Sequence, residues 1–182
     1  MSKINRLLNN YKKHISIPWQ EVAPAQRVIF CVYNEGDERR LRAKIDEFEI
    51  ATVETGFRWA LFDLTSLFAE WLAGQRYAEK YFQKPHLLLT LKPSFLTYIE
   101  EQFKGFLERA AADDQTVVSL KGVGSLFGFV RVKEVVERLA PLVNGRLLVF
   151  FPGTYENNNY RLLDAYDGWD YLSVPIGPEQ DF

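Results

Sequence analysis

The stretch RVIFCVYNEGDERRLRAKIDEFEIATVETG, residues 27–56, joins an apolar run to a polar segment with regularly spaced apolar residues. The run Arg27–Tyr33 predicts a buried β-strand, because it is short, apolar and rich in β-branched and aromatic residues. Asp37 is placed to act as the N-cap of the helix that follows, and Gly56 to end it. The apolar positions of that helix recur at helical spacing: Leu41, Ile45, Phe48 and Thr52.

The same strand-then-helix order recurs along the rest of the chain. Further strands are predicted at residues 58–64, 116–120 and 146–151, with a last short strand over Tyr171–Pro175. Helices are predicted at residues 65–73 and 131–140, and short helices and turns between residues 74 and 91. A longer helix begins near Pro93, a residue that suits a first helical turn, and carries an apolar stripe: Phe95, Ile99, Phe103, Phe106 and Ala110.

Strands separated by helices predict a mainly parallel sheet. The continuous apolar runs IFCV and LLVFF favour strands that are covered on both sides, since such strands need not alternate apolar and polar residues. We therefore expect one α/β domain over residues 1–182, a three-layer sandwich with helices on both faces of the sheet.

An amphipathic helix is expected near the N-terminus, over about residues 2–15. Its apolar side could pack on the domain, which we favour, or serve a partner. The residues on that side are Ile4, Leu7, Leu8, Tyr11 and Ile15.

Composition excludes several classes of protein. The net charge of −2 is unlike that of a general nucleic-acid binder, and no apolar run approaches the roughly 20 residues of a membrane-spanning helix. The N-terminus does not resemble a signal peptide, so a soluble cytoplasmic protein is expected. The single cysteine, Cys31, is expected in the core, and the separated His14 and His86 do not indicate a zinc site. We expect no cofactor and no bound metal.

Four polar segments follow predicted strands: residues 34–38, 63–66, 121–125 and 152–159. Loops that leave the carboxyl ends of parallel strands lie along one edge of the sheet, where ligands of such folds usually bind. We therefore expect these four segments, the last of them as a loop, to converge.

The segment KGVGS, residues 121–125, raises the alternative of a nucleotide- or phosphate-binding domain with a degenerate P-loop-like architecture. Gly122, Gly124 and Ser125 could present backbone N–H groups to an anion, with Asp63 in the same cleft. However, the P-loop pattern and the dinucleotide fingerprint are both absent. A tight turn with close backbone packing is the favoured interpretation, with Asp63 capping the next helix together with Thr65 or Ser66. No complete catalytic set is evident, and we expect no enzymatic activity.

Three consecutive asparagines follow the apolar run at residues 147–151. Side-chain amides compete with the backbone for hydrogen bonds, which is costly in a regular element but useful in a loop. Tyr and Arg, which flank the triplet, are enriched in binding hot spots. Two interpretations stay open, namely that the flanking aromatics anchor the loop or that the segment binds a partner. The partner-binding candidates are Tyr155, Glu156, Asn157, Asn158, Asn159, Tyr160 and Arg161.

These segments carry a resemblance to a known family. INRLLNNYKKH (residues 4–14), PWQEVAPAQRVIFCVYNEGDERRLRAKIDEFE (18–49), VVSLKGVGSLFGFVRV (117–132) and RLLVFFPGTYENNNYRLLDAYDGWDYLSVPI (146–176) resemble the BrxB family of BREX bacteriophage-exclusion systems. The run FPGTYENNNYRLLDA is long and compositionally unusual, which makes it the most specific of these signals.

The resemblance implies a role in phage resistance, within an assembly that distinguishes methylated host DNA from phage DNA. It implies no enzymatic activity for this chain, because the methyltransferase, the ATPase BrxC and the phosphatase-like PglZ carry the recognisable chemistry. We therefore expect an adaptor that binds PglZ, with BrxC as a further partner and without direct DNA binding.

Overall fold

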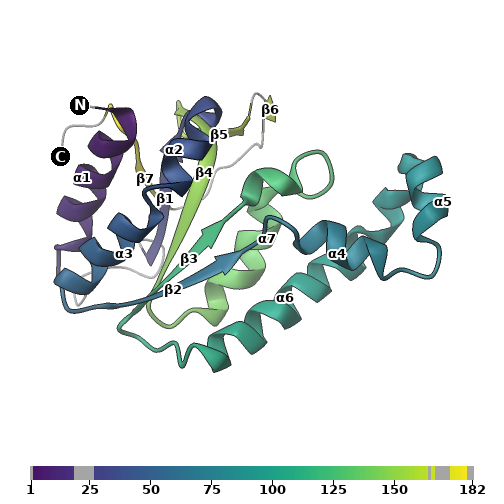
Figure 1. Cartoon of the computed structure of the whole chain (residues 1–182), viewed down its shortest axis with the longest axis horizontal. Coiled ribbons are helices and arrows are strands. Elements are labelled where there is room, and N and C mark those ends of the chain that lie inside the picture. The colour runs from purple at the N-terminus through teal and green to yellow at the C-terminus, as the bar shows by residue number, and fades with distance from the viewer. Residues whose placement is uncertain (1, 19–26, 164, 167–172, 180–182) are drawn as a thin grey trace.

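The computed structural model describes residues 2–18, 27–163, 165–166 and 173–179, and it confirms a mainly parallel α/β sheet. The five strands of this sheet lie in the order β2-β3-β4-β1-β7, and each neighbouring pair is parallel (Figure 1). They are β1 (Val28–Tyr33), β2 (Arg58–Asp63), β3 (Thr116–Lys121), β4 (Arg146–Glu156) and β7 (Val174–Ile176).

Helices cover both faces of the sheet, as predicted. On one face α1 (Lys3–Ile15), α2 (Glu38–Arg42) and α3 (Ile45–Glu54) form a core with Ile29, Cys31 and other strand residues. On the other face α4 (Leu67–Ala73), α6 (Lys92–Arg109) and α7 (Val132–Leu139) pack on residues such as Phe30 and Val149. All residues of β1 are buried, because they alternate between two covered faces.

Helix α1 packs on its own domain, which is the interpretation that we favoured from the sequence. Its apolar residues, which are Ile4, Leu7, Leu8, Tyr11 and Ile15, are all buried.

The segment after β1 differs from the prediction in its first turns. A 3-10 turn, η3 (Glu35–Asp37), precedes α2, and a break at residues 43–44 separates α2 from α3. Asp37 occupies the N-cap position of α2 but makes no capping hydrogen bond there, so the expected cap is wrong. Its carboxylate instead accepts a hydrogen bond from Arg40 at 2.7 Å, while Asn34 caps the 3-10 turn. The left-handed Gly56 follows the end of α3, as predicted.

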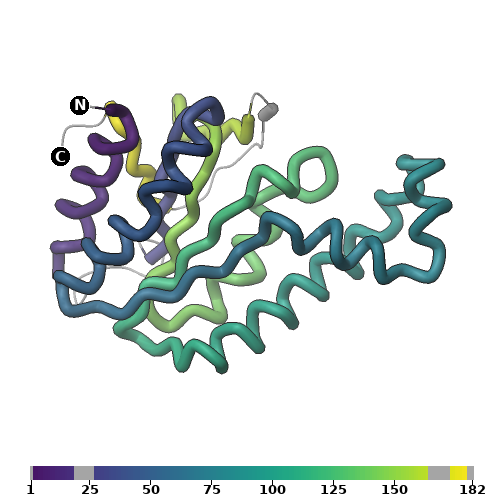
Figure 2. The backbone as a smooth tube through the Cα atoms, in the orientation of Figure 1, coloured from purple at the N-terminus to yellow at the C-terminus, as the bar shows by residue number. Residues whose placement is uncertain are grey.

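Short helices fill the segment between β2 and α6. The helix predicted from residue 65 begins at Leu67, and α5 (Ala78–Gln83) and the 3-10 helix η4 (Pro85–Leu91) follow. In α6 the stripe is buried at Phe95, Ile99 and Phe103, whereas Ala110 lies beyond the end of the helix and is exposed. Figures 1 and 2 show that α4, α5, η4 and the start of α6 extend away from the sheet, and we call this projection the arm.

The segment predicted as a loop at residues 152–159 is a β-hairpin, so this expectation is wrong. Strand β4 continues to Glu156, the chain turns at Asn157 and Asn158, and β5 (Asn159–Leu162) returns antiparallel to it. Strand β6 (Ala165–Tyr166) pairs with β5. The last strand is β7, which begins at Val174, and residues 171–172 of its predicted range lie outside the described residues.

Two short 3-10 helices, η5 (Val123–Leu126) and η6 (Ala140–Leu142), complete the described elements. Among the helices of the described ranges, none is long and apolar enough to cross a membrane.

Candidate functional site

The hairpin of β4 and β5 projects beyond the carboxyl edge of the parallel sheet (Figure 1). In its ladder Gly153 pairs with Leu162, Thr154 with Arg161, and Tyr155 with Tyr160. Side chains of a strand alternate between its two faces, so the hairpin has an inward and an outward face. Gly153 is required for the close approach of the strands, because a Cβ atom there would lie 1.9 Å from the carbonyl oxygen of Arg161.

The inward face anchors the hairpin. Tyr160 is 1% exposed, and its ring centroid lies 4.7 Å from that of Phe30 and 4.6 Å from that of the half-buried Tyr155. The Tyr160 hydroxyl lies 2.8 Å from Ser173 Oγ, and burial raises the pKa of this phenol. Tyr160 was among the predicted partner-binding residues, but its position in the core makes it an anchor instead.

The outward face carries the polar residues of the same segment. Thr154, Glu156 and Arg161 are exposed, and so are Asn157 and Asn158 of the turn, whereas Asn159 is half-buried. Asn157 and Asn158 have φ values of 50° and 62°, the left-handed values that a two-residue type I′ turn requires. Asn is one of the few non-glycine residues that tolerate this conformation. The triplet is thus compatible with a regular element because two of its members form the turn.

Two side-chain hydrogen bonds lie within the turn. Tyr155 Oη donates to Asn158 Oδ1 at 3.0 Å, and Asn159 Nδ2 donates to the carbonyl oxygen of Asn157 at 3.0 Å. The Asn157 side chain is exposed, and its amide makes no such bond with any residue that the structure describes. We call the set Thr154, Glu156, Asn157, Asn158, Asn159 and Arg161 the hairpin polar face.

A groove of about 270 Å³ runs beside the hairpin. It lies at the carboxyl ends of β1, β4 and β7. Near this point the helices that follow β1 cover one face of the sheet, whereas the helices that follow β2 and β3 cover the other face. Such a switch point is where open α/β sheets most often bind ligands. The lining residues include Tyr33, Asn34, Thr154, Tyr155 and Pro175.

The Lys121–Ser125 segment forms the predicted tight turn. Gly122 has φ of 80°, and a Cβ atom there would lie 2.6 Å from the backbone nitrogen of Thr65, so the backbones of the two loops pack directly. Ser125 Oγ lies 2.9 Å from the Leu64 carbonyl oxygen and 2.7 Å from that of Gly122, which tie its hydroxyl proton to the turn. A Cβ atom on Gly124 would meet Pro152, so this turn adjoins β4.

Asp63 already has partners in this region. Its carboxylate lies 3.0 Å from Lys121 Nζ and accepts a hydrogen bond from the backbone N–H of Thr65 at 2.9 Å. Partial burial raises the pKa of Asp63, but the hydrogen bonds from Thr65 and Lys121 outweigh it and hold that pKa below its usual range. This Asp63 bond shapes the loop that precedes α4, whose own N-cap position, Ser66, makes no capping hydrogen bond.

A short series of polar contacts continues from the Asp63–Lys121 pair toward β1. The sequence did not predict these contacts. Arg42 donates to Glu38 Oε1 at 2.7 Å and approaches Thr65 Oγ1 at 3.4 Å, while Tyr33 donates to the other Glu38 oxygen. Glu38 and Arg42 are four residues apart on a helix, which is a readable signal for an ion pair. Their closeness to Thr65 depends on the sheet order and has no local signal. The segments 34–38, 63–66 and 121–125 therefore do converge at one edge.

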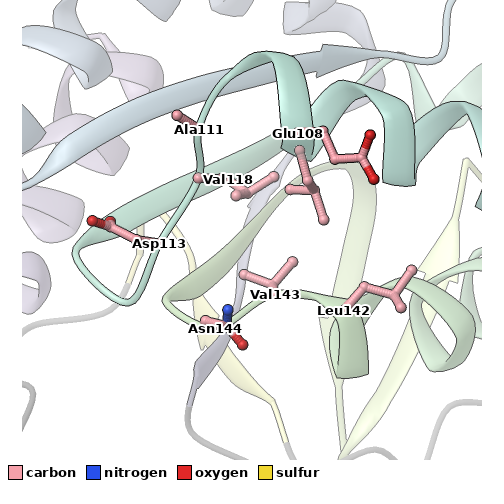
Figure 3. A pocket seen from close by; sticks show the side chains of 9 residues that line it. Glu108, Ala111, Asp113, Val118, Leu142, Val143 and Asn144 are labelled. Atoms are coloured by element: carbon pink, nitrogen blue, oxygen red, sulfur yellow. The ribbon is translucent and has the colours of Figure 1, made fainter.

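A second hollow of about 250 Å³ lies at the opposite, amino edge of the sheet. Figure 3 shows Val118, Leu142 and Val143 around it, while the Asp113 side chain points away. Asp113 is paired with Arg58 and accepts a hydrogen bond from Thr116, which together lower its pKa. Besides these aliphatic side chains, Glu108 and Asn144 line the hollow, and we assign no function to it.

Comparison with known families identifies the chain. The model of the family described as BREX protein BrxB matches residues 60–174, which is more than half of the sequence. The chain belongs to the BrxB family. It is therefore a component of a BREX anti-phage defence system. The match includes the hairpin and the arm, whereas the resembling segments before residue 60 lie outside it. No curated protein and no solved structure shows a significant match to the chain.

Proposed function

We propose that this BrxB-family chain is a non-catalytic adaptor that binds other BREX subunits through the hairpin polar face. The exposed, hydrogen-bonded turn is the observation that supports this proposal most directly. A docking element that is ordered before binding loses less conformational entropy when a partner binds it. Tyr160 and the two turn hydrogen bonds supply that order.

The chemistry of the face suits a polar protein partner. Asparagine amides both donate and accept hydrogen bonds, and Arg161 adds a planar cation able to bind a carboxylate in a bidentate manner. The groove beside β4 extends the surface with apolar contacts at Pro175 and Val32. Family resemblance points to PglZ as the partner and to BrxC as a further one.

The turn geometry decides how the proposal is best tested. Replacement of the asparagines by alanine would strain two left-handed positions and confuse loss of contact with loss of structure. The variant Asn157→Gly/Asn158→Gly removes both amides but keeps a turn that glycine favours. Combined with Arg161→Glu, it should weaken binding to at least one purified BREX subunit by tenfold or more, as measured by titration calorimetry.

A matched control is Asn144→Gly, which removes an exposed amide at the opposite edge of the sheet. This control should bind as the wild type does. Unchanged affinity of the hairpin variant for every subunit would show that the hairpin is not the docking surface.

The alternative of a nucleotide- or phosphate-binding site at Gly122, Gly124, Ser125 and Asp63 has weaker support. Its lysine and carboxylate neutralise each other, and its hydroxyl is bonded within the turn. A thermal-shift panel of ATP, GTP and an oligonucleotide tests it. A stabilisation that disappears in Lys121→Ala, or a hydrolytic rate lost in Asp63→Asn, would favour this alternative and count against a non-catalytic adaptor.

A further inference from the structure

The end of the arm exposes an unusual concentration of apolar side chains. Neither α5 nor η4 contains a buried residue. Tyr77 is 54% exposed, and Phe82 and Leu89 are each 65% exposed, so three of the seven large exposed apolar residues in the described ranges lie here. We call residues 76–91 the arm tip. Clustered exposed apolar side chains of this size mark interaction sites more often than isolated ones do.

The arm tip is not simply a poorly packed segment. Three other apolar residues of the tip, Tyr81, Leu88 and Leu91, are half-buried and pack against the core on the α6 face of the sheet. At the base of the arm, the ring of Phe68 lies 5.1 Å from that of Phe95 and 4.6 Å from that of Phe129. The base is thus held by aromatic contacts while Phe82 and Leu89 point outward. The apolar residues of the tip divide into an inner set and an outer set.

The arm tip is also positively charged. The arm tip contains the cations Arg76, Lys80 and Lys84 and the single carboxylate Glu79, although the whole chain has a net charge of −2. None of these three cations forms an ion pair with any described residue. Arg76 lies over the ring of Tyr77, 5.4 Å from its centroid. The tip therefore presents apolar side chains bordered by unpaired positive charge.

We propose that the arm tip inserts into an apolar groove, rimmed by carboxylates, on another protein of the defence system. An apolar helical segment that fills a groove is a common mode of recognition, and opposite charges at the rim raise association rates and exclude wrong partners. Figure 1 places α5 far from the hairpin of β4 and β5. Together with the hairpin polar face, the arm tip would give the chain two separate docking surfaces. This inference extends the adaptor function and does not depend on the hairpin as a contact.

The test uses the full chain and purified BREX subunits in titration calorimetry. The variant Phe82→Glu/Leu89→Glu should weaken binding to one subunit by at least tenfold. Its matched control is Ile50→Glu/Val53→Glu, which alters side chains of similar exposure, 54% and 55%, on α3. The control should keep wild-type affinity, and circular dichroism should show the same helical content in all variants.

Charge reversal supplies an independent variant. Lys80→Glu/Lys84→Glu should weaken the same interaction and flatten its salt dependence, whereas Arg39→Glu, an exposed cation on α2, should not. Equal affinity of both arm variants and the wild type for every subunit would overturn the inference. It would also be overturned if Lys80→Glu/Lys84→Glu abolished binding to duplex DNA or to phosphatidylserine vesicles while no subunit was affected.

The same titrations separate this inference from the adaptor surface proposed above. A loss with the hairpin variant alone supports the hairpin surface and rejects the arm. A loss with the arm variants alone does the reverse, and no binding of the wild-type chain to any subunit rejects both.

Discussion

The hairpin and the arm both project from the sheet, but they expose opposite kinds of side chain. The hairpin directs Tyr160 into the core and presents amides and Arg161 to solvent. The arm buries aromatic rings at its base and presents Tyr77, Phe82 and Leu89 at its end. A hairpin has two faces set by strand alternation, so one can be apolar and anchored while the other is polar. In the arm tip, none of the described residues of α5 and η4 is buried.

Projection from the sheet is therefore not enough to identify a docking surface. The hairpin is an interaction candidate because its exposed polar groups lie on a hydrogen-bonded turn, and the arm tip because its exposed side chains are large and apolar. Stability measurements on matched substitutions separate the residues that anchor each projection from those that are available to a partner.

The largest effect is expected from Tyr160→Ala in the hairpin, compared with Tyr77→Ala in the arm. Loss of a fully buried aromatic ring leaves a cavity against Phe30 and Phe151 and should lower the free energy of unfolding by roughly 3 kcal/mol. Tyr77→Ala should stay within about 0.5 kcal/mol of the wild type, because that ring is exposed. Urea denaturation measures both. Similar values for the two variants would contradict the assignment of Tyr160 as the anchor.

Gly153→Ala in the hairpin and Gly74→Ala in the arm form the next comparison. A Cβ atom at residue 153 overlaps the Arg161 carbonyl, so the strands must separate, at a cost of about 2 kcal/mol. At residue 74 a Cβ atom meets only ordinary contacts, the nearest at 3.5 Å, and φ is −79°. Gly74→Ala should therefore be neutral or stabilising by up to about 1 kcal/mol. Thermal unfolding gives both values, and a neutral Gly153→Ala would mean that the hairpin strands do not pair as described.

Asn157→Ala and Asn158→Ala test the turn. Alanine has no side-chain amide that favours a positive φ, as asparagine does. Each substitution should therefore lower the free energy of unfolding by about 1 kcal/mol. Asn157→Gly and Asn158→Gly should each cost little, since glycine adopts that conformation freely. Equal unfolding midpoints for the alanine and glycine variants would argue against the type I′ turn.

The smallest effect is expected from Phe82→Ser/Leu89→Ser at the arm tip. Both side chains are exposed, so the unfolding free energy of the isolated chain should change by less than about 0.5 kcal/mol. If urea denaturation shows that the free energy of unfolding falls by more than about 1.5 kcal/mol, these residues pack on the chain itself and are not available to a partner.

The class of the fold was readable from local pattern. The apolar runs of β1 and β4 require burial on both faces, and the periodic residues between strands require helices, so a covered parallel sheet follows without long-range information. Local pattern also predicted the helix end at Gly56, the helix start near Pro93 and the N-terminal helix. Caps, helix breakers and amphipathic stripes act over only a few residues, so they can be recognised from the sequence. The convergence of the polar segments at one edge followed from the parallel arrangement.

The hairpin was not readable in the same way, because consecutive asparagines suit both a loop and a type I′ turn. Which one forms depends on whether a second strand pairs with β4 and whether Tyr160 finds a site against Phe30. Asp37 does not cap α2: it is the last residue of the 3-10 turn, and its carboxylate pairs with Arg40. The outward direction of Phe82 and Leu89 likewise has no sequence signal that separates them from their neighbours Tyr81 and Leu88. Periodicity records which residues share a face of an element, whereas exposure depends on what the rest of the chain brings against that face.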